Sequence, residues 1–419
     1  MLPNIKFLLA SCCLILFSAC NTHSDDSSAA LPVAFPAEQI ENETPCPQTP
    51  KITYTDLDSI PHLPDPFSSA GGARITEMEE WGCRRDEIGA MAQQFELGAK
   101  PAKPVDVTGS YRQDTLQVRV EHDGITIAFD SEIILPSVGQ PPYPAVIGIG
   151  RSFLDNSQLD SLGVAIINFP NNTIAEQMGG SSRGKGAFYE LYGRDHSAGA
   201  LMAWSWGVSR LIDVLETTES PIDAGQLGVT GCSRNGKGAL IAGAFDERIA
   251  LTIPQESGAG GAAAWRISDA LLEDGQNVQT LRQIVGENVW FMDAFSEFSE
   301  SVEKLPYDHH EVMGMVAPRA LLVLEHSGID WLGPESTYGA SLAAREVWSA
   351  MGVPDRMGVS QMSGHNHCQL PDSQKPHVEA FVNAFLLGDT EMGTQIVETD
   401  RDFTVDENRW IPWETPKLR

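Results

Sequence analysis

Short continuous runs of apolar residues recur along the chain from about residue 144 onward. They are AVIGIG (145–150), VAIINF (164–169), LGVTG (227–231), IALTI (249–253) and ALLVLE (320–325). Gly and Pro border them, and residues with helical apolar spacing separate several of them, as in Leu201–Leu215 and Gly236–Phe245. Strands covered by helices on both faces have this pattern. The alternation predicts an α/β fold, a three-layer αβα sandwich with a mainly parallel central sheet.

A different, alternating pattern occupies residues 105 to 135. Leu116, Val118 and Val120 alternate with polar residues, and a second alternating run follows His122-Asp123-Gly124. Two such runs around a turn predict a β-hairpin. Apolar spacing also predicts a helix over Cys83–Leu97, which Gly98 ends, and a final helix over His377–Leu387.

The N-terminal residues 1–20 have the composition of a signal peptide, with one Lys, a short apolar stretch and small residues before Cys20. Cys20 also resembles a bacterial lipoprotein box, so lipidation and ordinary cleavage both remain open. No other segment is long and apolar enough to span a bilayer. We expect a secreted protein with a polar linker and N-terminal strap at 21–60, a catalytic domain at 61–390 and a C-terminal extension at 391–419.

The charge balance is strongly acidic, with 57 Asp and Glu against 28 Lys and Arg and a formal net charge of −29. Nucleic acid is excluded as a partner because phosphate binding needs a basic face. The ordinary consequence of such acidity is solubility. The charge therefore suggests no substrate.

The strongest local signal for chemistry is GVTGCSRNGKG (228–238). A short strand runs into a small-x-Ser-x-x-Gly turn and then into an Ala-rich helix, which would expose Ser233 and direct backbone N–H groups at an oxyanion. The strict G-x-S-x-G pattern is not met, because Gly236 comes one residue late. A phosphate-binding loop or a plain tight turn would give a similar segment.

Residues downstream supply a base and an acid in the order expected for this fold, Ser then Asp or Glu then His. His367 lies in GHNHC (364–368), between a strand-like run and the last helix. Glu256 and Glu325 each follow a predicted strand, and position along the chain slightly favours Glu325. A structural pair of histidines is the alternative for GHNHC.

Metal ligation by the histidines of GHNHC, or by Asp308-His309-His310, is disfavoured. Neither segment has the i, i+4 histidines of a helical metal site, and neither has a Cys-x-x-Cys companion. We expect no metal.

Cysteines occur at positions 12, 13, 20, 46, 83, 232 and 368, and four of them follow the leader. An even number in an exported chain predicts two disulfides, with three possible pairings. Cys232 precedes Ser233 and Cys368 follows His367, so a bridge between them would hold nucleophile and base within reach of each other. Cys46–Cys83 would then tie the strap to the first helix.

From about Leu63 to Leu387 the sequence resembles the glucuronoyl esterases, carbohydrate esterase family fifteen, particularly the fungal 4-O-methyl-glucuronoyl methylesterase type. The matching stretches are WGCRRDEI (81–88), GSSRGKGAFYELYG (180–193), GVTGCSRNGKGAL (228–240), PQESG (254–258), GQNVQT and GENVWF (275–291), LPYDHH (305–310), DWLG (330–333) and GHNHC (364–368). The resemblance implies an α/β-hydrolase fold.

The resemblance also implies roles for individual residues. It makes Ser233 the nucleophile, His367 the base and Glu256 the acid, against the positional preference for Glu325. Arg234 would contribute to the oxyanion hole. The residues implied to bind the sugar are Lys237, Gln279, Glu287 and Trp331. The third disulfide of fungal relatives is absent, because Ala264 and Ala340 stand at the corresponding positions.

The implied reaction is hydrolysis of the ester between 4-O-methyl-D-glucuronic acid of plant glucuronoxylan and lignin alcohols, through a glucuronoyl-enzyme intermediate. No cofactor is implied, and we expect a monomer. An acetyl-xylan or feruloyl-type esterase on the same fold is one alternative. A non-catalytic carbohydrate-binding or adhesion module is another, against which an intact Ser, Glu and His argue.

Overall fold

The computed structural model describes residues 1, 31–40, 42, 45–47 and 52–419. Residues Pro32–Arg419 form one compact unit. The expected signal peptide beyond Met1, including Cys20, and the linker as far as residue 30 lie outside the described residues. Within the described part of the chain, no helix is long and apolar enough to cross a membrane.

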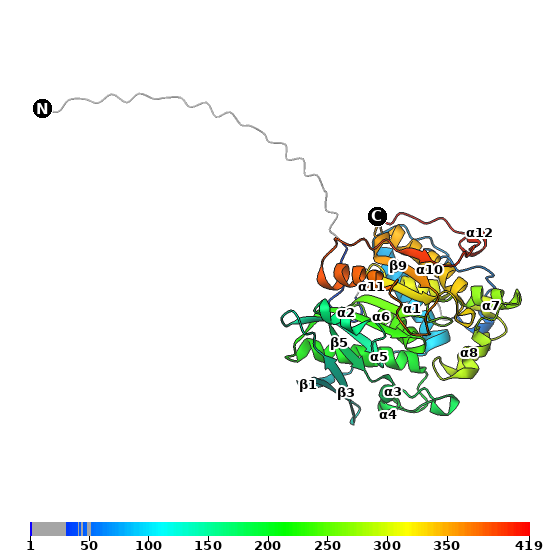
Figure 1. Ribbon diagram of the computed structural model, residues 1–419. Coiled ribbons are helices and arrows are strands. Elements are labelled where there is room, and N and C mark those ends of the chain that lie inside the picture. The colour runs from blue at the N-terminus through cyan, green and yellow to red at the C-terminus, as the bar shows by residue number, and fades with distance from the viewer. Residues whose placement is uncertain (2–30, 41, 43–44, 48–51) are drawn as a thin grey trace. The chain divides into compact units, whose positions relative to one another are not determined.

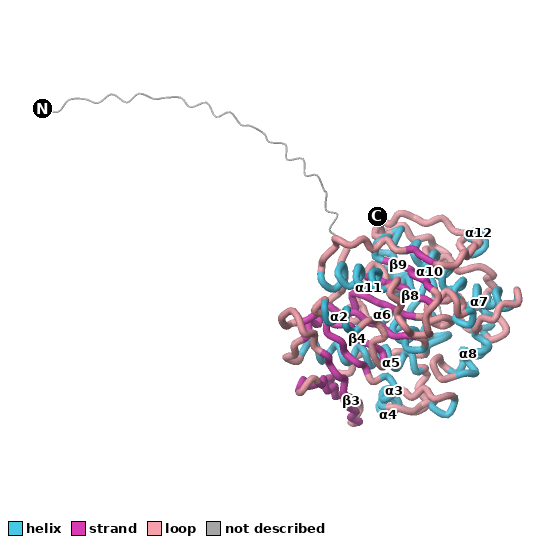
Figure 2. The backbone as a smooth tube through the Cα atoms, viewed as in Figure 1, coloured by secondary structure: helices cyan, strands magenta, loops and turns pink. Residues whose placement is uncertain are grey.

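A ten-stranded sheet forms the centre of this unit (Figures 1 and 2). The strand order is β1-β2-β3-β5-β4-β6-β7-β8-β9-β10. Neighbours from β5 to β10 pair in parallel, whereas β1, β2 and β3 pair antiparallel up to the contact of β3 with β5. The strands are β1 (Asp106–Arg112), β2 (Thr115–His122), β3 (Ile125–Ile134), β4 (Tyr143–Ile149), β5 (Ala165–Phe169), β6 (Ile222–Cys232), β7 (Ile249–Gln255), β8 (Ala320–His326), β9 (Met357–Met362) and β10 (Val397–Thr399).

Helices cover both faces of the sheet, which confirms the predicted three-layer sandwich. On one face, α6 and α10 pack on the sheet, and α5 and α9 pack against α6. On the opposite face, α2 and α11 pack on the sheet. The helices are α1 (Met78–Ala92), α2 (Asn156–Ser161), α3 (Asn171–Ile174), α4 (Ala187–Tyr192), α5 (Ala200–Thr217), α6 (Arg234–Phe245), α7 (Trp265–Glu273), α8 (Leu281–Glu287), α9 (His309–Gly314), α10 (Pro334–Ala350), α11 (Lys375–Val382) and α12 (Glu407–Trp410).

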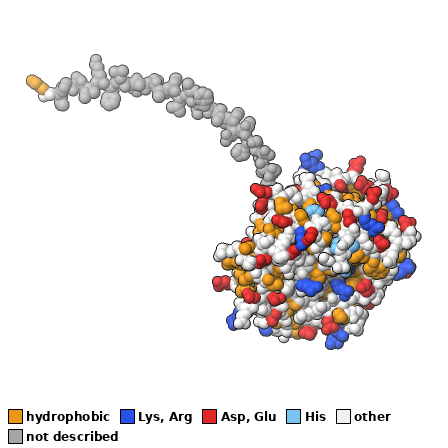
Figure 3. All heavy atoms as spheres, in the orientation of Figure 1, with side chains coloured by type: hydrophobic (Ala, Val, Ile, Leu, Met, Phe, Trp, Pro, Cys, Tyr) orange, Lys and Arg blue, Asp and Glu red, His pale blue; other side chains and the backbone are white. Residues whose placement is uncertain are grey.

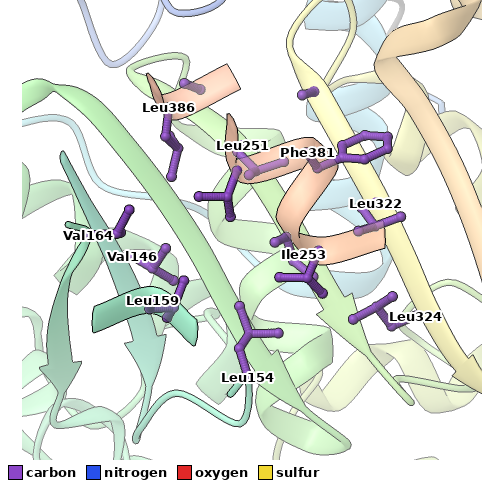
Figure 4. Packing of buried hydrophobic residues seen from close by; sticks show 14 of the residues in the cluster. Val146, Leu154, Leu159, Val164, Leu251, Ile253, Leu322, Leu324, Phe381 and Leu386 are labelled. Carbon is purple, nitrogen blue, oxygen red and sulfur yellow. The ribbon is translucent and has the colours of Figure 1, made fainter. Parts of the chain in front are cut away.

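The core beneath α11 shows why the continuous apolar runs fold as buried strands. Val146 of β4, Leu251 of β7 and Leu322 of β8 meet Phe381 and Leu386 from the C-terminal helical segment (Figure 4). All five are at most 2% exposed. Burying each large apolar side chain contributes roughly 1.5–3 kcal/mol. This packing fixes the sheet on which the site is built.

Two predicted helices are extended by a turn of π-helix. The helix expected at Cys83–Leu97 comprises α1 and a π-turn at Gln93–Leu97, and the last helix comprises α11 and a π-turn at Asn383–Leu387. With these π-turns, the two helical segments end at Leu97 and Leu387, the residues predicted from the sequence.

Strand β1 lies within the alternating segment 105–135 but outside the two named runs of the predicted hairpin, and β10 was not predicted. Strand β1 precedes the predicted hairpin, and β10 lies within the expected C-terminal extension 391–419 and pairs with β9. The extension thus forms an edge of the catalytic sheet. The N-terminal strap is joined to α1 by the disulfide Cys46–Cys83.

Candidate functional site

Ser233 is the single residue between β6 and α6, and its backbone has φ 59° and ψ −126°. A non-Gly residue in this region is strained, and such strain at a strand-to-helix turn is typical of a nucleophile elbow. The Ser233 N–H donates to Gln255 O at 2.9 Å, which ties the turn to the end of β7. The side chain is therefore displayed at the carboxyl edge of the sheet.

Small residues around the turn allow its backbone segments to approach closely. A Cβ on Gly231 would lie 2.3 Å from Asn235 O, and one on Gly236 would lie 2.6 Å from Gln255 O. Both distances are below any real Cβ contact. The late glycine of the motif is thus required by the contact between α6 and the end of β7, which explains the departure from G-x-S-x-G.

His367 and Glu256 form the contact expected of a base and its orienting acid. His367 Nδ1 lies 2.6 Å from Glu256 Oε2, which also accepts the Cys368 N–H at 2.8 Å. Glu256 is buried, whereas the His367 side chain is 41% exposed. Among the described residues, the hydrogen bond of His367 is through Nδ1, which leaves Nε2 available for proton transfer.

Glu325 does not take the acid position that its place in the chain suggested. Its carboxylate accepts the His326 N–H at 2.9 Å and the Gly258 N–H at 3.4 Å, and Glu256 occupies His367 Nδ1. Burial raises the pKa of Glu325 to about 8, and the nearby charge of Glu256 adds to this shift. This shift favours the neutral carboxyl, which stabilises an imidazolium less well than a carboxylate does.

Both predicted disulfides are present. Cys232–Cys368 has a Cα–Cα distance of 5.6 Å and joins the residue before Ser233 to the residue after His367. Cys46–Cys83 has a Cα–Cα distance of 5.2 Å. The first bridge holds the loop after β9 against the turn at Ser233, because Cys232 is adjacent to Ser233 and Cys368 is adjacent to His367.

Two cations of the first turn of α6 gather around one aromatic ring. The guanidinium carbon of Arg234 lies 5.3 Å from the centroid of Trp290, and Lys237 Nζ lies 5.9 Å from it. Arg234 is exposed, whereas Lys237 is 4% exposed and donates to Ser257 O. Burial lowers the pKa of Lys237 to about 8, although the charges of Glu325 and Glu287 oppose this shift.

The remaining residues implied to bind sugar lie together beside this pair. Gln279 Nε2 donates to Glu287 Oε2 at 2.5 Å, and the Gln279 backbone N–H donates to Trp331 O at 3.1 Å. Trp331 is 38% exposed. Trp331 and Glu287 thus expose an indole and a carboxylate, while the amide of Gln279 lies buried beneath them at 6% exposure. Such groups can bind a hydroxylated ring.

Comparison with known proteins identifies the family. The family model described as "Glucuronyl esterase, fungi" matches residues 118–352. A 4-O-methyl-glucuronoyl methylesterase of Neurospora crassa is 47% identical over 94% of this chain and 97% of its own length. The chain belongs to the glucuronoyl esterase family.

Solved glucuronoyl esterases have the same fold as this family member. The catalytic domain from Hypocrea jecorina has a TM-score of 0.84 at 46% identity, over 88% of this chain and 99% of that chain. An enzyme variant from Sporotrichum thermophile, solved in complex with methyl 4-O-methyl-β-D-glucopyranuronate, has a TM-score of 0.83 at 46% identity, over 87% and 97%.

At the two positions where the family resemblance implied that a third disulfide is missing, this chain has packed alanines. Ala264 and Ala340 are both 0% exposed. Ser336 Oγ, one helical turn before Ala340 on α10, donates to Ala264 O at 2.9 Å. A hydrogen bond therefore joins the two segments that carry these alanines in this glucuronoyl esterase.

Sequence reasoning missed two residues that contact the site. Trp290 lies in the quoted stretch GENVWF but had no role assigned, and its ring carries both Arg234 and Lys237. The side chain of His365, the first histidine of GHNHC, is 4% exposed, and its Nδ1 lies 3.7 Å from Glu256 Oε1. Both residues lie in motifs shared with the family, so the motifs could have pointed to them. Their contacts with the site residues, however, depend on the fold and cannot be read from the sequence.

The histidines considered as metal ligands have other partners. His309 Nε2 bonds Glu96 Oε1 at 2.8 Å and its Nδ1 bonds Gly261 O at 2.5 Å, while His310 Nε2 bonds Pro64 O at 2.8 Å. The side chains of Cys232, Glu256, His367 and Cys368 also cluster, but the two cysteines are joined in a disulfide and offer no thiolate. Neither cluster therefore has the free ligands of a metal site.

Proposed function

We propose that this protein is a serine-type carboxylic ester hydrolase that cleaves esters of 4-O-methyl-D-glucuronic acid. The observation that carries the proposal is the 2.6 Å contact of Glu256 with His367 Nδ1, which a disulfide holds beside Ser233. Support for the substrate comes from the Sporotrichum thermophile relative, whose ligand is a methyl ester of this sugar acid.

In the proposed mechanism, His367 Nε2 takes the proton of Ser233 as Oγ attacks the ester carbonyl carbon. The negative charge that appears on the carbonyl oxygen is stabilised by Arg234 and by N–H groups at the start of α6. The bond from carbon to the alcohol oxygen then breaks, and His367 returns the proton to the departing alcohol. Water, deprotonated by His367, then attacks the glucuronoyl-Ser233 carbonyl carbon; the bond from carbon to Ser233 Oγ breaks and His367 returns the proton to Oγ, which releases the uronic acid. Glu256 keeps the imidazole in its tautomer throughout.

Sugar recognition is assigned to Lys237, Gln279, Glu287 and Trp331. Lys237 is buried beside the nucleophile turn, so its ammonium has a fixed position from which to donate to a sugar hydroxyl. The Gln279–Glu287 pair adds a second polar site, and the exposed Trp331 indole offers a flat face to the ring.

We further propose that the natural substrates are the esters that join glucuronoxylan to lignin alcohols in plant cell walls, and that the enzyme acts outside the cell. The two disulfides support export, because such bridges persist in oxidising compartments.

The decisive experiment compares Ser233→Ala with the wild-type protein on benzyl glucuronate and on acetylated xylan. Wild-type enzyme should hydrolyse the glucuronate ester, and Ser233→Ala should lower turnover by at least about 10⁴-fold with unchanged circular dichroism. Preference for acetylated xylan or for feruloyl esters would instead favour the alternative esterases. A folded Ser233→Ala variant that keeps a tenth of the activity would refute the nucleophile.

A further inference from the structure

The loop after β4 brings Arg151 and Phe153 to the edge of the site. A Cβ on Gly150, which has φ 74°, would lie 3.0 Å from Asn235 Nδ2. Asn235 follows Ser233 by two residues, in the first turn of α6. The loop is therefore in contact with the segment that carries Ser233, and the positive φ of Gly150 favours glycine at this turn.

Arg151 and Phe153 form a cation–π pair on this loop. The guanidinium carbon of Arg151 lies 4.7 Å from the centroid of the Phe153 ring. Arg151 is exposed and Phe153 is partly buried. Among the described residues, Arg151 contacts the Phe153 ring and forms no ion pair, although acidic residues of the sequence outnumber basic ones by 57 to 28. The outer face of its guanidinium plane is therefore accessible to a ligand.

The loop backbone is fixed on both sides of the pair. The Gly150 N–H donates to Phe169 O at 2.8 Å, and the Leu154 N–H donates to Ser152 Oγ at 3.2 Å. Leu154 is 6% exposed and belongs to the core of Figure 4. Arg151 and Phe153 are thus presented on a rigid support, which lowers the entropic cost of binding.

Strand order places this pair on the opposite side of Ser233 from two residues assigned to the sugar. Ser233 follows β6, and β4 and β7 are its two neighbours in the sheet. Gln279 belongs to the segment after β7 and Trp331 to the segment after β8. An ester whose sugar lies over the β7 and β8 side must extend its alcohol toward β4, because the reacting carbon is at Ser233.

We propose that Arg151 and Phe153 form a binding subsite for the aromatic ring of the leaving alcohol. A planar guanidinium that already covers one ring accepts a second ring on its other face, and neither ring needs hydrogen bonds. The subsite rests on the proposed function, since the leaving group is that of the glucuronoyl ester. It makes the enzyme selective for arylalkyl over simple alkyl esters.

The test compares benzyl and methyl glucuronate in wild-type enzyme, Arg151→Ala and Arg151→Lys. Both variants should raise KM for the benzyl ester about two- to fivefold, the range of an exposed cation–π contact, and leave the methyl ester unchanged. The lysine variant retains the positive charge but lacks the planar guanidinium on which an aromatic ring could stack. Arg74→Ala is the matched control, because Arg74 also lies over a phenylalanine, Phe67, at 5.6 Å. Equal changes for both esters, or none, would overturn the subsite.

A binding measurement separates this proposal from the proposed function. Saturation-transfer NMR with benzyl alcohol should give ring-proton signals with wild-type protein that fall by at least half in Phe153→Ala, whereas cyclohexylmethanol should give weak signals with both. This readout needs no turnover. Hydrolysis of neither ester would count against the proposed function, whereas equal benzyl alcohol signals in a folded Phe153→Ala variant would refute the subsite.

Discussion

At the scale of single residues, Glu256 and Glu325 lie at the ends of neighbouring strands but have opposite electrostatic environments. Glu256 accepts from His367 Nδ1 and from the Cys368 N–H, so its negative charge is stabilised. Glu325 is buried with weaker partners, and its pKa is raised to about 8. Below that pH the neutral form predominates, which is the form that a glutamine imitates.

Glu256→Gln should therefore lower kcat by about 10³–10⁴-fold, because an amide in place of the carboxylate no longer stabilises the imidazolium of His367. Glu325→Gln should change kcat by less than about threefold at pH 6–7. Steady-state kinetics on benzyl glucuronate at pH 6.5 decides between them, with thermal unfolding as the control for folding. A greater loss of kcat in Glu325→Gln than in Glu256→Gln would mean that Glu325, at the end of the later strand, is the acid that orients His367.

Arg234 and Lys237 differ in when they act. Because the ester is neutral on entry, the proposed mechanism has Arg234 interact chiefly with charge that develops in the transition state, and Lys237 bind hydroxyls in both ground and transition states. Lys237→Ala should chiefly raise KM for glucuronate esters, and Arg234→Ala should chiefly lower kcat. Hydrolysis of simple acetyl esters should not respond to Lys237→Ala. Equal losses on both ester types would leave Lys237 no role in sugar recognition.

Residue patterns singled out Ser233 and His367 because Ser233 lies at a strand-to-helix turn and His367 lies in the loop between the last long strand and the last long helix. Their catalytic roles stay predictions. The pattern could not choose between Glu256 and Glu325, since a strand end fixes the place of a side chain and not its hydrogen-bond partners. The resemblance to a family supplied the choice. His365 escaped notice because its relevance lies in a 3.7 Å approach to Glu256 across more than 100 residues.

At the scale of elements, the strands with continuous apolar runs were predictable and the sheet edges were not. Strands β7 and β8 are buried at every position. Because both of their faces are covered, their sequences are continuously apolar and easily recognised. Strand β1 has no buried residue, and β10 has three residues with none buried. An edge strand held mainly by backbone hydrogen bonds carries little side-chain pattern.

The bridge Cys232–Cys368 closes a separation of 136 residues, so chain entropy in the unfolded state gives it about 5 kcal/mol of stabilisation. Cys232→Ser with Cys368→Ser should lower the free energy of unfolding by up to that amount and also lower kcat, because the Cys368 N–H orients Glu256. The matched control is Cys46→Ser with Cys83→Ser. Its separation of 37 residues predicts about 4 kcal/mol, with kcat unchanged. Urea titrations and kinetics on both pairs test this, and equal kcat losses would deny the active-site bridge a positioning role.

At the scale of the whole molecule, the net charge of −29 means that repulsion between acidic groups would destabilise the fold unless they are dispersed or paired. On the face seen in Figure 3, acidic and basic side chains are interspersed. Several acids are instead paired inside the unit, as where Arg248 contacts Asp246 and Asp213, both at 2.7 Å. Glu38 of the N-terminal strap belongs to a neighbouring cluster, with Lys100 at 2.7 Å and Arg210 beside it.

Glu38 couples the docking of the strap to pH. Burial by itself would raise its pKa, but Lys100 and Arg210 outweigh that effect and lower the pKa to about 2. A carboxyl whose pKa is lower in the folded than in the unfolded state stabilises the fold above the unfolded value of about 4.5. That contribution is lost as pH falls toward 2.

Glu38→Gln should lower the free energy of unfolding by an amount on the order of 2–3 kcal/mol at pH 6–7, a figure discounted because the side chain is 20% exposed. The difference from wild type should shrink steadily between pH 4.5 and pH 2, since protonated Glu38 has lost the same charge. Urea unfolding at pH 7, 5 and 3 measures it. Glu121→Gln, an exposed acid with a 3.5 Å ion pair to Arg119, is the control and should change stability by less than about 1 kcal/mol. A constant difference at all three pH values would mean that Glu38 acts through packing, and that the buried ion pairs do not hold the strap.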